Sequence, residues 1–210
     1  MDQPGYFFLG GLVGYKLVVV DTETGGLDSE TKSILSLGAV IVEDGIIIDE
    51  FYMVIREDEI LVDEKALRIN GFTKQKIVAV GESPETVVEH FIDFLRKHNL
   101  TKKATIAGHN VEFDIGFIKR LFRLAERESD YGKYFSHRTI DTQATARVLT
   151  LAERITTKST SLDSLCQILG VNVRKGKIHN ALEDAKATAI LLTGFIDMIK
   201  PRKRVPDAWD

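Results

Sequence analysis

Two acids end an apolar run near the start of the chain. Residues 17–20 read Leu-Val-Val-Val, and Asp21 and Glu23 follow with one residue between them; two glycines come directly after Thr24. Such a run is typical of a strand buried on both faces. Side chains alternate along a strand, so Asp21 and Glu23 point to the same face, where two carboxylates repel each other. A hard divalent ion such as Mg²⁺ would relieve this repulsion, but two solvated acids at an exposed strand end fit the pattern as well.

Asp114 is a second candidate for the same chemistry. It lies in the stretch GHNVEFD, after a predicted short buried strand and in the first turn of a predicted apolar helix. An acid in that position also interacts favourably with the helix N-terminus, which by itself explains the residue without any metal.

His179 and Asp184 form the third candidate, in the stretch HNALEDA. Asp184 shares a helical face with Ala187 and Leu191, so its carboxylate is expected to face the interior of the protein. An inward acid needs a metal ion or a base as its partner. His179 lies just before the predicted helix, where its ring can turn toward the same point, although a lone histidine is often structural.

The composition indicates one soluble globular domain. The chain has 210 residues, of which 44% are hydrophobic and 28% charged. The net charge of -3 does not indicate a strongly basic nucleic-acid binder, although a local basic face is compatible with it. No stretch is long and apolar enough to span a bilayer. The single cysteine, Cys166, excludes an internal disulfide and favours a reducing, cytoplasmic location, with its thiol buried among apolar residues. We expect a leader of unknown role over 1–15, one domain over 16–198 and a basic tail over 199–210.

The order of predicted elements indicates a mixed α/β fold. Three sequential strands come first, and the Asp44-Gly45 pair between the second and third predicts a hairpin. Alternating helices and strands follow, and helices end the chain, which gives a sheet of about five strands. The predicted strands are 16–22, 33–44, 45–55, 104–110 and the start of 139–149, and the predicted helices are 63–69, 84–98, 112–128, the remainder of 139–149, 161–171 and 180–199.

Taken together, these stretches resemble a known family. VVVDTETGGL, AGHNVEFDIGFI, IDTQATAR, SLDSLCQILGV and HNALEDA are similar to the DEDDh 3′–5′ exonucleases of the ribonuclease H-like fold, and they cover roughly residues 16–198. This group includes the proofreading subunit of bacterial DNA polymerase III and ribonuclease T. The resemblance implies a mixed five-stranded sheet flanked by helices, and a hydrolase that shortens nucleic acids from the 3′ end.

The resemblance also implies roles for individual residues. Two divalent cations, Mg²⁺ or Mn²⁺, would be held by four acids, and His179 would act as the general base. The main chain at Thr22 and Glu23 would contact the terminal 3′ hydroxyl, and Leu27 would wedge against the last base. The implied metal ligands are Asp21, Glu23, Asp114 and Asp184, and the implied substrate-binding residues are Thr22, Glu23, Thr24, Leu27, Asn110 and His179.

Other matched positions are expected to serve the scaffold. We expect His109 and Phe113 to be structural and Asp141 to make structural hydrogen bonds. Asn180 occupies a position that is often basic in the family, and Gly25 stands where a second threonine is common. The basic residues of the loop before His179 either steer phosphates or are simply solvated; they are Arg174, Lys175 and Lys177.

The motifs leave the substrate and the setting open. The first expectation is an exonuclease on single-stranded DNA that releases nucleoside 5′-monophosphates in proofreading or repair, with a DNA polymerase subunit as a possible partner and no membrane partner. The alternatives are an RNA exonuclease acting on RNA 3′ ends, a non-catalytic module that binds nucleic acid or a polymerase, and a metal-dependent phosphatase. RNA and DNA differ at the 2′ hydroxyl, and the sequence does not locate the contacts to this group. The sequence also does not indicate an oligomeric state.

Overall fold

A mixed five-stranded sheet forms the centre of the protein. The computed structural model describes residues 15–171 and 178–200. The strand order is β3-β2-β1-β4-β5; β2 is antiparallel to β1 and β3, whereas β4 is parallel to β1 and β5. The strands are β1 (Lys16–Thr24), β2 (Ile34–Glu43), β3 (Ile46–Val54), β4 (Ala104–Gly108) and β5 (Phe135–Asp141).

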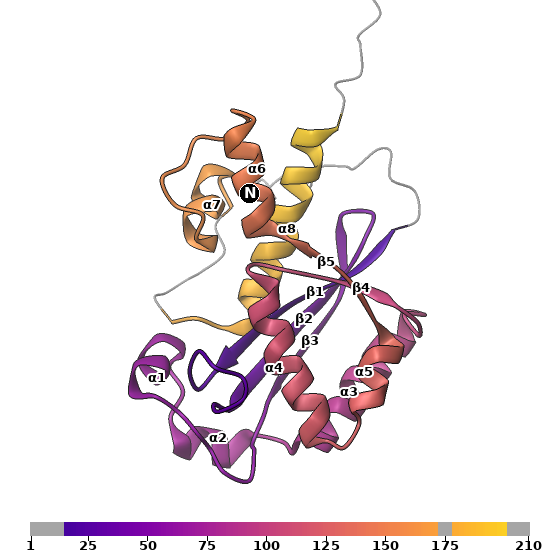
Figure 1. Ribbon diagram of the computed structural model, residues 1–210, viewed down its shortest axis with the longest axis vertical. Helices are drawn as coiled ribbons and strands as arrows, with labels where there is room; N and C mark the ends of the chain where they lie inside the picture. The colour runs from indigo at the N-terminus through magenta and orange to yellow at the C-terminus, as the bar shows by residue number, and fades with distance from the viewer. Residues whose placement is uncertain (1–14, 172–177, 201–210) are drawn as a thin grey trace, which may run out of the picture.

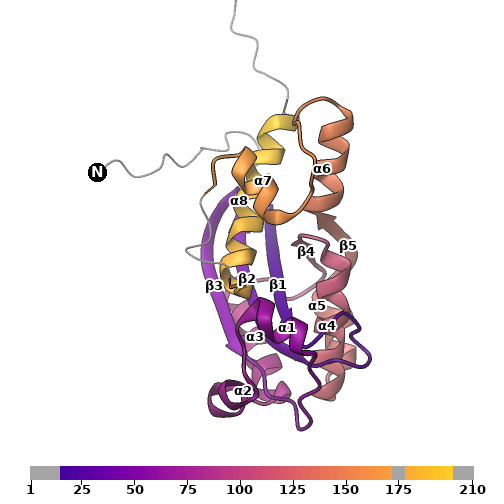
Figure 2. The ribbon, with the colours of Figure 1, turned by 90° about the vertical axis from the view of Figure 1, so that its left-hand side faces the viewer.

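Helices cover both faces of this sheet (Figure 1, Figure 2). One face packs against α8, the other packs against α3 and α4, and α6 and α7 lie against the second half of α8. This three-layer arrangement confirms the predicted fold class. The helices are α1 (Glu64–Asn70), α2 (Lys74–Val80), α3 (Pro84–Lys97), α4 (Val111–Leu124), α5 (Glu128–Tyr134), α6 (Thr142–Leu151), α7 (Leu162–Ile168) and α8 (Ala181–Ile199).

The predicted hairpin between β2 and β3 is present. Asp44 and Gly45 have φ angles of 50° and 84°. Positive φ at both central residues is the conformation that Asp-Gly favours in two-residue hairpins. On its other edge, β2 pairs with β1, and this register places Gly38 of β2 opposite Asp21 of β1, and Ser36 opposite Glu23. Directly paired residues point to the same face, so these four positions share the face covered by α8.

The strand that carries the first two acids is buried between the helical layers. Val18 and Val20 pack in the core beneath α4, whereas Leu17 and Val19 pack beneath α8. Burial of both faces explains the unbroken apolar run, which on an exposed sheet would alternate with polar residues. Cys166 is buried in α7, as expected. A rigid strand therefore leads directly to the acids.

Two short helices were not predicted from the sequence. The chain forms α2 within 74–80, and it forms α5 where the predicted helix 112–128 was expected to end. The longer helix stops at Leu124, and Glu126 has a φ of 56°, which breaks the helical path before α5. Helices of two turns carry too few apolar positions for their period to be recognised.

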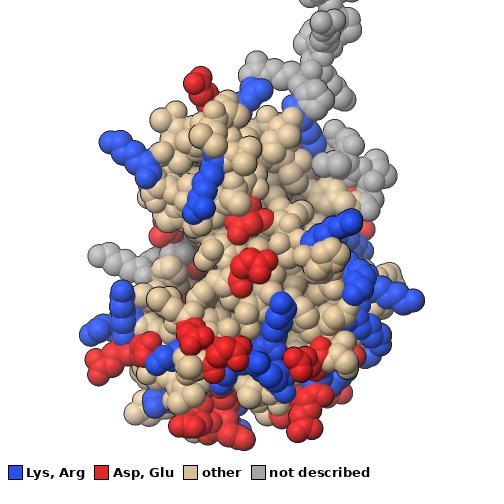
Figure 3. Space-filling view, in the orientation of Figure 1, with Lys and Arg blue, Asp and Glu red and all other residues tan. Residues whose placement is uncertain are grey.

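Charges of both signs are mixed on the surface. Figure 3 shows lysine and arginine side chains interspersed with acidic ones on the face of Figure 1, and acidic side chains also lie near the centre of that face. No helix of the described part is long and apolar enough to cross a membrane. The expected leader up to residue 14, the basic loop residues 174, 175 and 177, and the tail from residue 201 lie outside the described residues.

Candidate metal and active site

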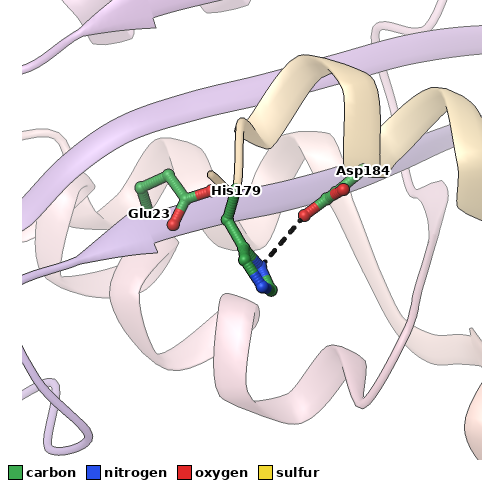
Figure 4. A group of neighbouring side chains, drawn as sticks. All are labelled: Glu23, His179 and Asp184. Atoms are coloured by element: carbon green, nitrogen blue, oxygen red, sulfur yellow. Dashed lines mark ion pairs between the residues drawn. The ribbon is translucent and has the colours of Figure 1, made fainter. Parts of the chain in front are cut away.

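Glu23, His179 and Asp184 form a compact cluster. One potential ligand atom from each lies within 4.8 Å of the others (Figure 4). Glu23 and Asp184 are buried, with 7% and 2% of their surface exposed, while the side chain of His179 is 39% exposed. His179 Nδ1 lies 3.4 Å from Asp184 Oδ2. The structure thus brings together three of the predicted site residues from the two ends of the chain.

The start of α8 positions Asp184 and His179. Asn180 caps this helix, because its Oδ1 accepts hydrogen bonds from the N–H groups of Leu182 and Glu183, at 3.1 and 3.2 Å. Asp184 lies in the first turn, where the helix dipole favours an acid, and it faces inward as its spacing predicted. Asn180 therefore has a structural role at the position where the family often carries a basic residue.

Asp21 faces the same side of the sheet as Glu23, and a glycine makes room beside it. Gly38 lies opposite Asp21 on β2. A Cβ at Gly38 would lie 2.3 Å from the carbonyl carbon of Ala181 and 2.4 Å from the backbone nitrogen of Leu182. The missing side chain lets the start of α8 rest directly on the sheet. The sequence alone gave no reason to select Gly38, because the contact depends on where α8 packs.

Asp114 reaches β1 from the other layer of helices. Its Oδ1 accepts hydrogen bonds from the N–H and the hydroxyl of Thr22, at 2.9 and 2.8 Å. Thr22 points to the opposite face from Asp21 and Glu23, so Asp114 joins the strand next to the Glu23 cluster without being part of it. Asp114 is 3% exposed, and burial raises its pKa to about 7, although the bonds from Thr22 lower it.

Most of the predicted substrate-binding residues lie at the end of β1 or in the loop that follows it. Leu27 is 87% exposed in the loop after the strand, and Thr24 is buried, with its hydroxyl donating to the carbonyl of Gly26 at 2.7 Å. Arg120 of α4 holds this loop through the carbonyls of Ser29 and Glu30. A leucine so exposed at the tip of a braced loop is available for contact with a ligand.

Asp141 joins the starts of two helices. Its carboxylate accepts hydrogen bonds from the N–H groups of Asn110 and Val111 at the start of α4, and of Ala144 in α6. This confirms the expected structural role. Asn110, a predicted substrate-binding residue, is exposed with a φ of 63° at the start of α4.

His109 and Phe113, the two other residues expected to serve the scaffold, also contact their neighbours. His109 Nδ1 lies 2.9 Å from the hydroxyl of Thr142, and burial lowers the pKa of His109, which favours the neutral ring. Phe113 packs 5.1 Å, centre to centre, from the ring of Phe117. His109 thus contacts the start of α6 and Phe113 packs within α4, which agrees with the structural roles expected of both residues.

The donor atoms of the cluster suit a divalent cation. Removing two carboxylates from water costs several kcal/mol per charge unless a positive charge compensates them. Carboxylate oxygens are the ligands that Mg²⁺ and Mn²⁺ prefer, and an imidazole nitrogen is tolerated by transition metals. The residues present therefore fit a metal site, and Asp21 is placed on the face where it can contribute to it.

Comparison with protein families agrees with the geometry. A family model described as exonuclease, RNase_T, matches residues 18–192. DNA polymerase III of the PolC type from Thermotoga petrophila is 33% identical over 183 residues, which cover 87% of this chain and 12% of that protein. The PolC-type polymerase of Clostridium perfringens is 28% identical over 190 residues, again 12% of its length. This chain therefore spans only a small part of the curated relatives it matches.

Solved structures share the fold. E. coli exonuclease I in complex with a dT13 oligonucleotide superposes with a TM-score of 0.72 at 19% identity, covering 86% of this chain and 40% of that one. Exonuclease I without ligand gives a TM-score of 0.73 at 20% identity, covering 89% and 43%. These similarities support the sheet and helix arrangement described above.

The buried Asp114 predicts a pH dependence of stability in the absence of metal ions. Its pKa in the folded protein, about 7, lies above its ordinary value of 3.8. The folded state therefore holds a proton that the unfolded state loses, so stability falls as pH rises from about 4 through 7, by up to about 4 kcal/mol. Denaturant unfolding in EDTA between pH 5 and pH 8.5 measures this slope.

Asp114→Asn is the control for this prediction, since the amide oxygen can still accept from Thr22 without gaining charge. The variant is expected to have a flatter profile and to be at least as stable as the wild type at pH 8. A variant that keeps the full wild-type slope would show that another group is responsible.

Gly38 predicts a steric effect on the site. Gly38→Ala would place Cβ against the backbone of Ala181 and Leu182, so α8 must move away from the sheet. We expect a loss of about 1–3 kcal/mol in stability and a drop of about 100-fold in any catalytic activity of the site, because Asp184 and His179 move with the start of the helix. Gly132→Ala is the matched control, since its Cβ would meet nothing within 4 Å. Equal effects of the two substitutions would contradict the steric account.

Proposed function

This chain belongs to the exonuclease family, and from that premise we propose that it removes nucleotides one by one from the 3′ end of single-stranded DNA. The observation that carries the proposal is the Glu23, His179 and Asp184 cluster at the end of β1. Relatives named as PolC-type DNA polymerase III support DNA as the substrate and a polymerase as the setting, in proofreading or repair.

Two divalent cations, Mg²⁺ or Mn²⁺, are the proposed cofactors. The proposed ligands are Asp21, Glu23 and Asp184 on the α8 side of β1, and Asp114, which is bonded to Thr22 on the other side of the strand. Bound divalent ions supply positive charge that stabilises the attacking and leaving oxygens of a phosphodiester hydrolysis. The protein's contribution is a set of carboxylates mounted on a strand that is buried on both faces, so that they keep their geometry during the reaction.

His179 is the proposed general base. It accepts a proton from the attacking water while the water oxygen bonds to phosphorus, and the 3′ oxygen of the preceding nucleotide leaves with the electrons of the broken bond. Asp184, whose Oδ2 lies 3.4 Å from Nδ1, orients the imidazole ring. The partial exposure of the ring allows the proton to pass on to solvent. The product is a nucleoside 5′-monophosphate.

The loop after β1 is the proposed binding site for the last nucleotide. The exposed Leu27 would pack against the terminal base, and stacking or apolar contact of this kind tolerates all four bases. The backbone at Thr22 and Glu23 would contact the 3′ hydroxyl. Thr24 would hold the loop in shape through its bond to Gly26, and the exposed Asn110 lies at the start of α4, where it would contact substrate.

The direct test is a digestion of 5′-labelled single-stranded DNA and RNA of the same sequence, with Mg²⁺, with Mn²⁺ and with EDTA. Sequencing gels should show a metal-dependent ladder that shortens from the 3′ end, with DNA degraded faster than RNA. Faster digestion of RNA than of DNA would instead make RNA the substrate. No shortening of either strand by folded protein would overturn the proposal and favour a binding module.

The role of His179 gives a quantitative prediction. His179→Ala should lower kcat on DNA by about 10²- to 10⁴-fold, the usual contribution of a general base. The carboxylates remain, so the rise in melting temperature on addition of Mn²⁺ should be nearly unchanged. His137→Ala, at an exposed position on β5, is the control and should behave as the wild type. Loss of the Mn²⁺ effect together with activity would instead make His179 a metal ligand.

A further inference from the structure

We propose that the C-terminal turn of α1, residues 69–71, positions two parts of the site relative to each other: Glu23 at the end of β1, and His179 just before α8. Asn70 is the central positioning residue of this turn. The inference rests on the proposed function, because it assigns how the general base is held against the end of β1. Figure 2 shows α1 next to the tip of β1 and below the first turn of α8. The turn therefore lies where these two elements meet.

Asn70 is a buried polar residue whose side chain bridges two backbone segments. It is 5% exposed. Its Nδ2 donates to the carbonyl of Thr24, the residue after Glu23, at 3.1 Å, and its Oδ1 accepts from the N–H of Phe72 at 3.1 Å. Removing either bond would leave a buried polar group unpaired, which is costly. Asn70 thus fixes the end of β1 to the turn that follows α1.

The neighbouring peptide holds the other part of the site. The N–H of His179 donates to the carbonyl of Ile69 at 3.2 Å. Two adjacent residues, Ile69 and Asn70, therefore bind the backbone of His179 and the backbone of Thr24. Because Thr24 follows Glu23 directly, any movement of this turn changes the distance between the Glu23 carboxylate and the imidazole ring.

Gly71 completes the arrangement. It ends α1 in the left-handed conformation with a φ of 67°, and a Cβ there would lie 2.8 Å from Cγ2 of Ile178, the residue before His179. At the N-terminal end of the same helix, the N–H of Asp63 donates to the carbonyl of Gly25 at 2.6 Å. Both ends of α1 are thus attached to the chain just after Glu23, so the helix links this part of the chain to the backbone of His179.

The test uses substitutions in the turn that leave the proposed ligands and the proposed base intact. Asn70→Asp keeps the acceptor for Phe72 but replaces the donor to Thr24, and Asn70→Ala removes both. On DNA, kcat is expected to fall about 10- to 100-fold with KM nearly unchanged, since catalytic geometry is lost and binding is not. The Mn²⁺-induced rise in melting temperature should be retained. Folded Asn70 variants with wild-type kcat would overturn the proposal.

Two glycines give a matched comparison. Gly71 and Gly170 have φ angles of 67° and 66°, but a Cβ at Gly170 would meet nothing within 4 Å. Replacing each with alanine therefore imposes the same backbone strain, while only Gly71→Ala presses on Ile178. The proposal expects a lower kcat for Gly71→Ala alone. Equal kcat values would contradict it.

Amide hydrogen exchange separates this proposal from the proposed function. In EDTA, without substrate, the His179 N–H should exchange at least about 10-fold faster in Asn70→Asp and Gly71→Ala than in the wild type, with the amides of β1 unchanged. This result would support the positioning role of residues 69–71 even if the wild type proved inactive as an exonuclease. Unchanged exchange at His179 would overturn the positioning role of residues 69–71 even if the wild type degrades DNA.

Discussion

The burial of negative charge at the end of β1 is the constraint on which the rest of the structure depends. Glu23, Asp114 and Asp184 are all at least nine-tenths buried, although an ionised carboxylate in the interior costs several kcal/mol when nothing compensates it. Thr22 offers two hydrogen bonds to Asp114, and His179 lies beside Asp184. Bound cations would supply the remaining compensation and would thereby stabilise the site as a whole.

The architecture places these charges by close contact between layers. β1 lies between α4 on one face and α8 on the other, so acids from both helices converge on a single strand end. Gly38 lets the first turn of α8 lie against the sheet, and Arg120 braces the loop that carries Leu27. Small residues and backbone hydrogen bonds, rather than the acids themselves, set the distances within the site.

The sequence predicted the elements with a strong period and the residues that lie on them. Alternation along β1 correctly placed Asp21 and Glu23 on one face, and helical spacing correctly turned Asp184 inward. The bond between Thr22 and Asp114, the contact of Gly38 with Ala181, and the bridge formed by Asn70 each join segments far apart in the chain. No local pattern encodes such contacts, because they arise only when helices pack on the sheet. The helices α2 and α5 were missed for a different reason, because two turns carry too few apolar positions for a helical period to be recognised.

The central claim is that these carboxylates hold divalent cations at the end of β1. Anomalous diffraction from crystals grown with Mn²⁺ and a nucleoside 5′-monophosphate tests it most directly. The account predicts two manganese peaks, with Asp21, Glu23 and Asp184 among the ligands and the phosphate of the nucleotide beside the metals. Crystals with no peak at this cluster, or with manganese bound only elsewhere on the protein, would contradict it.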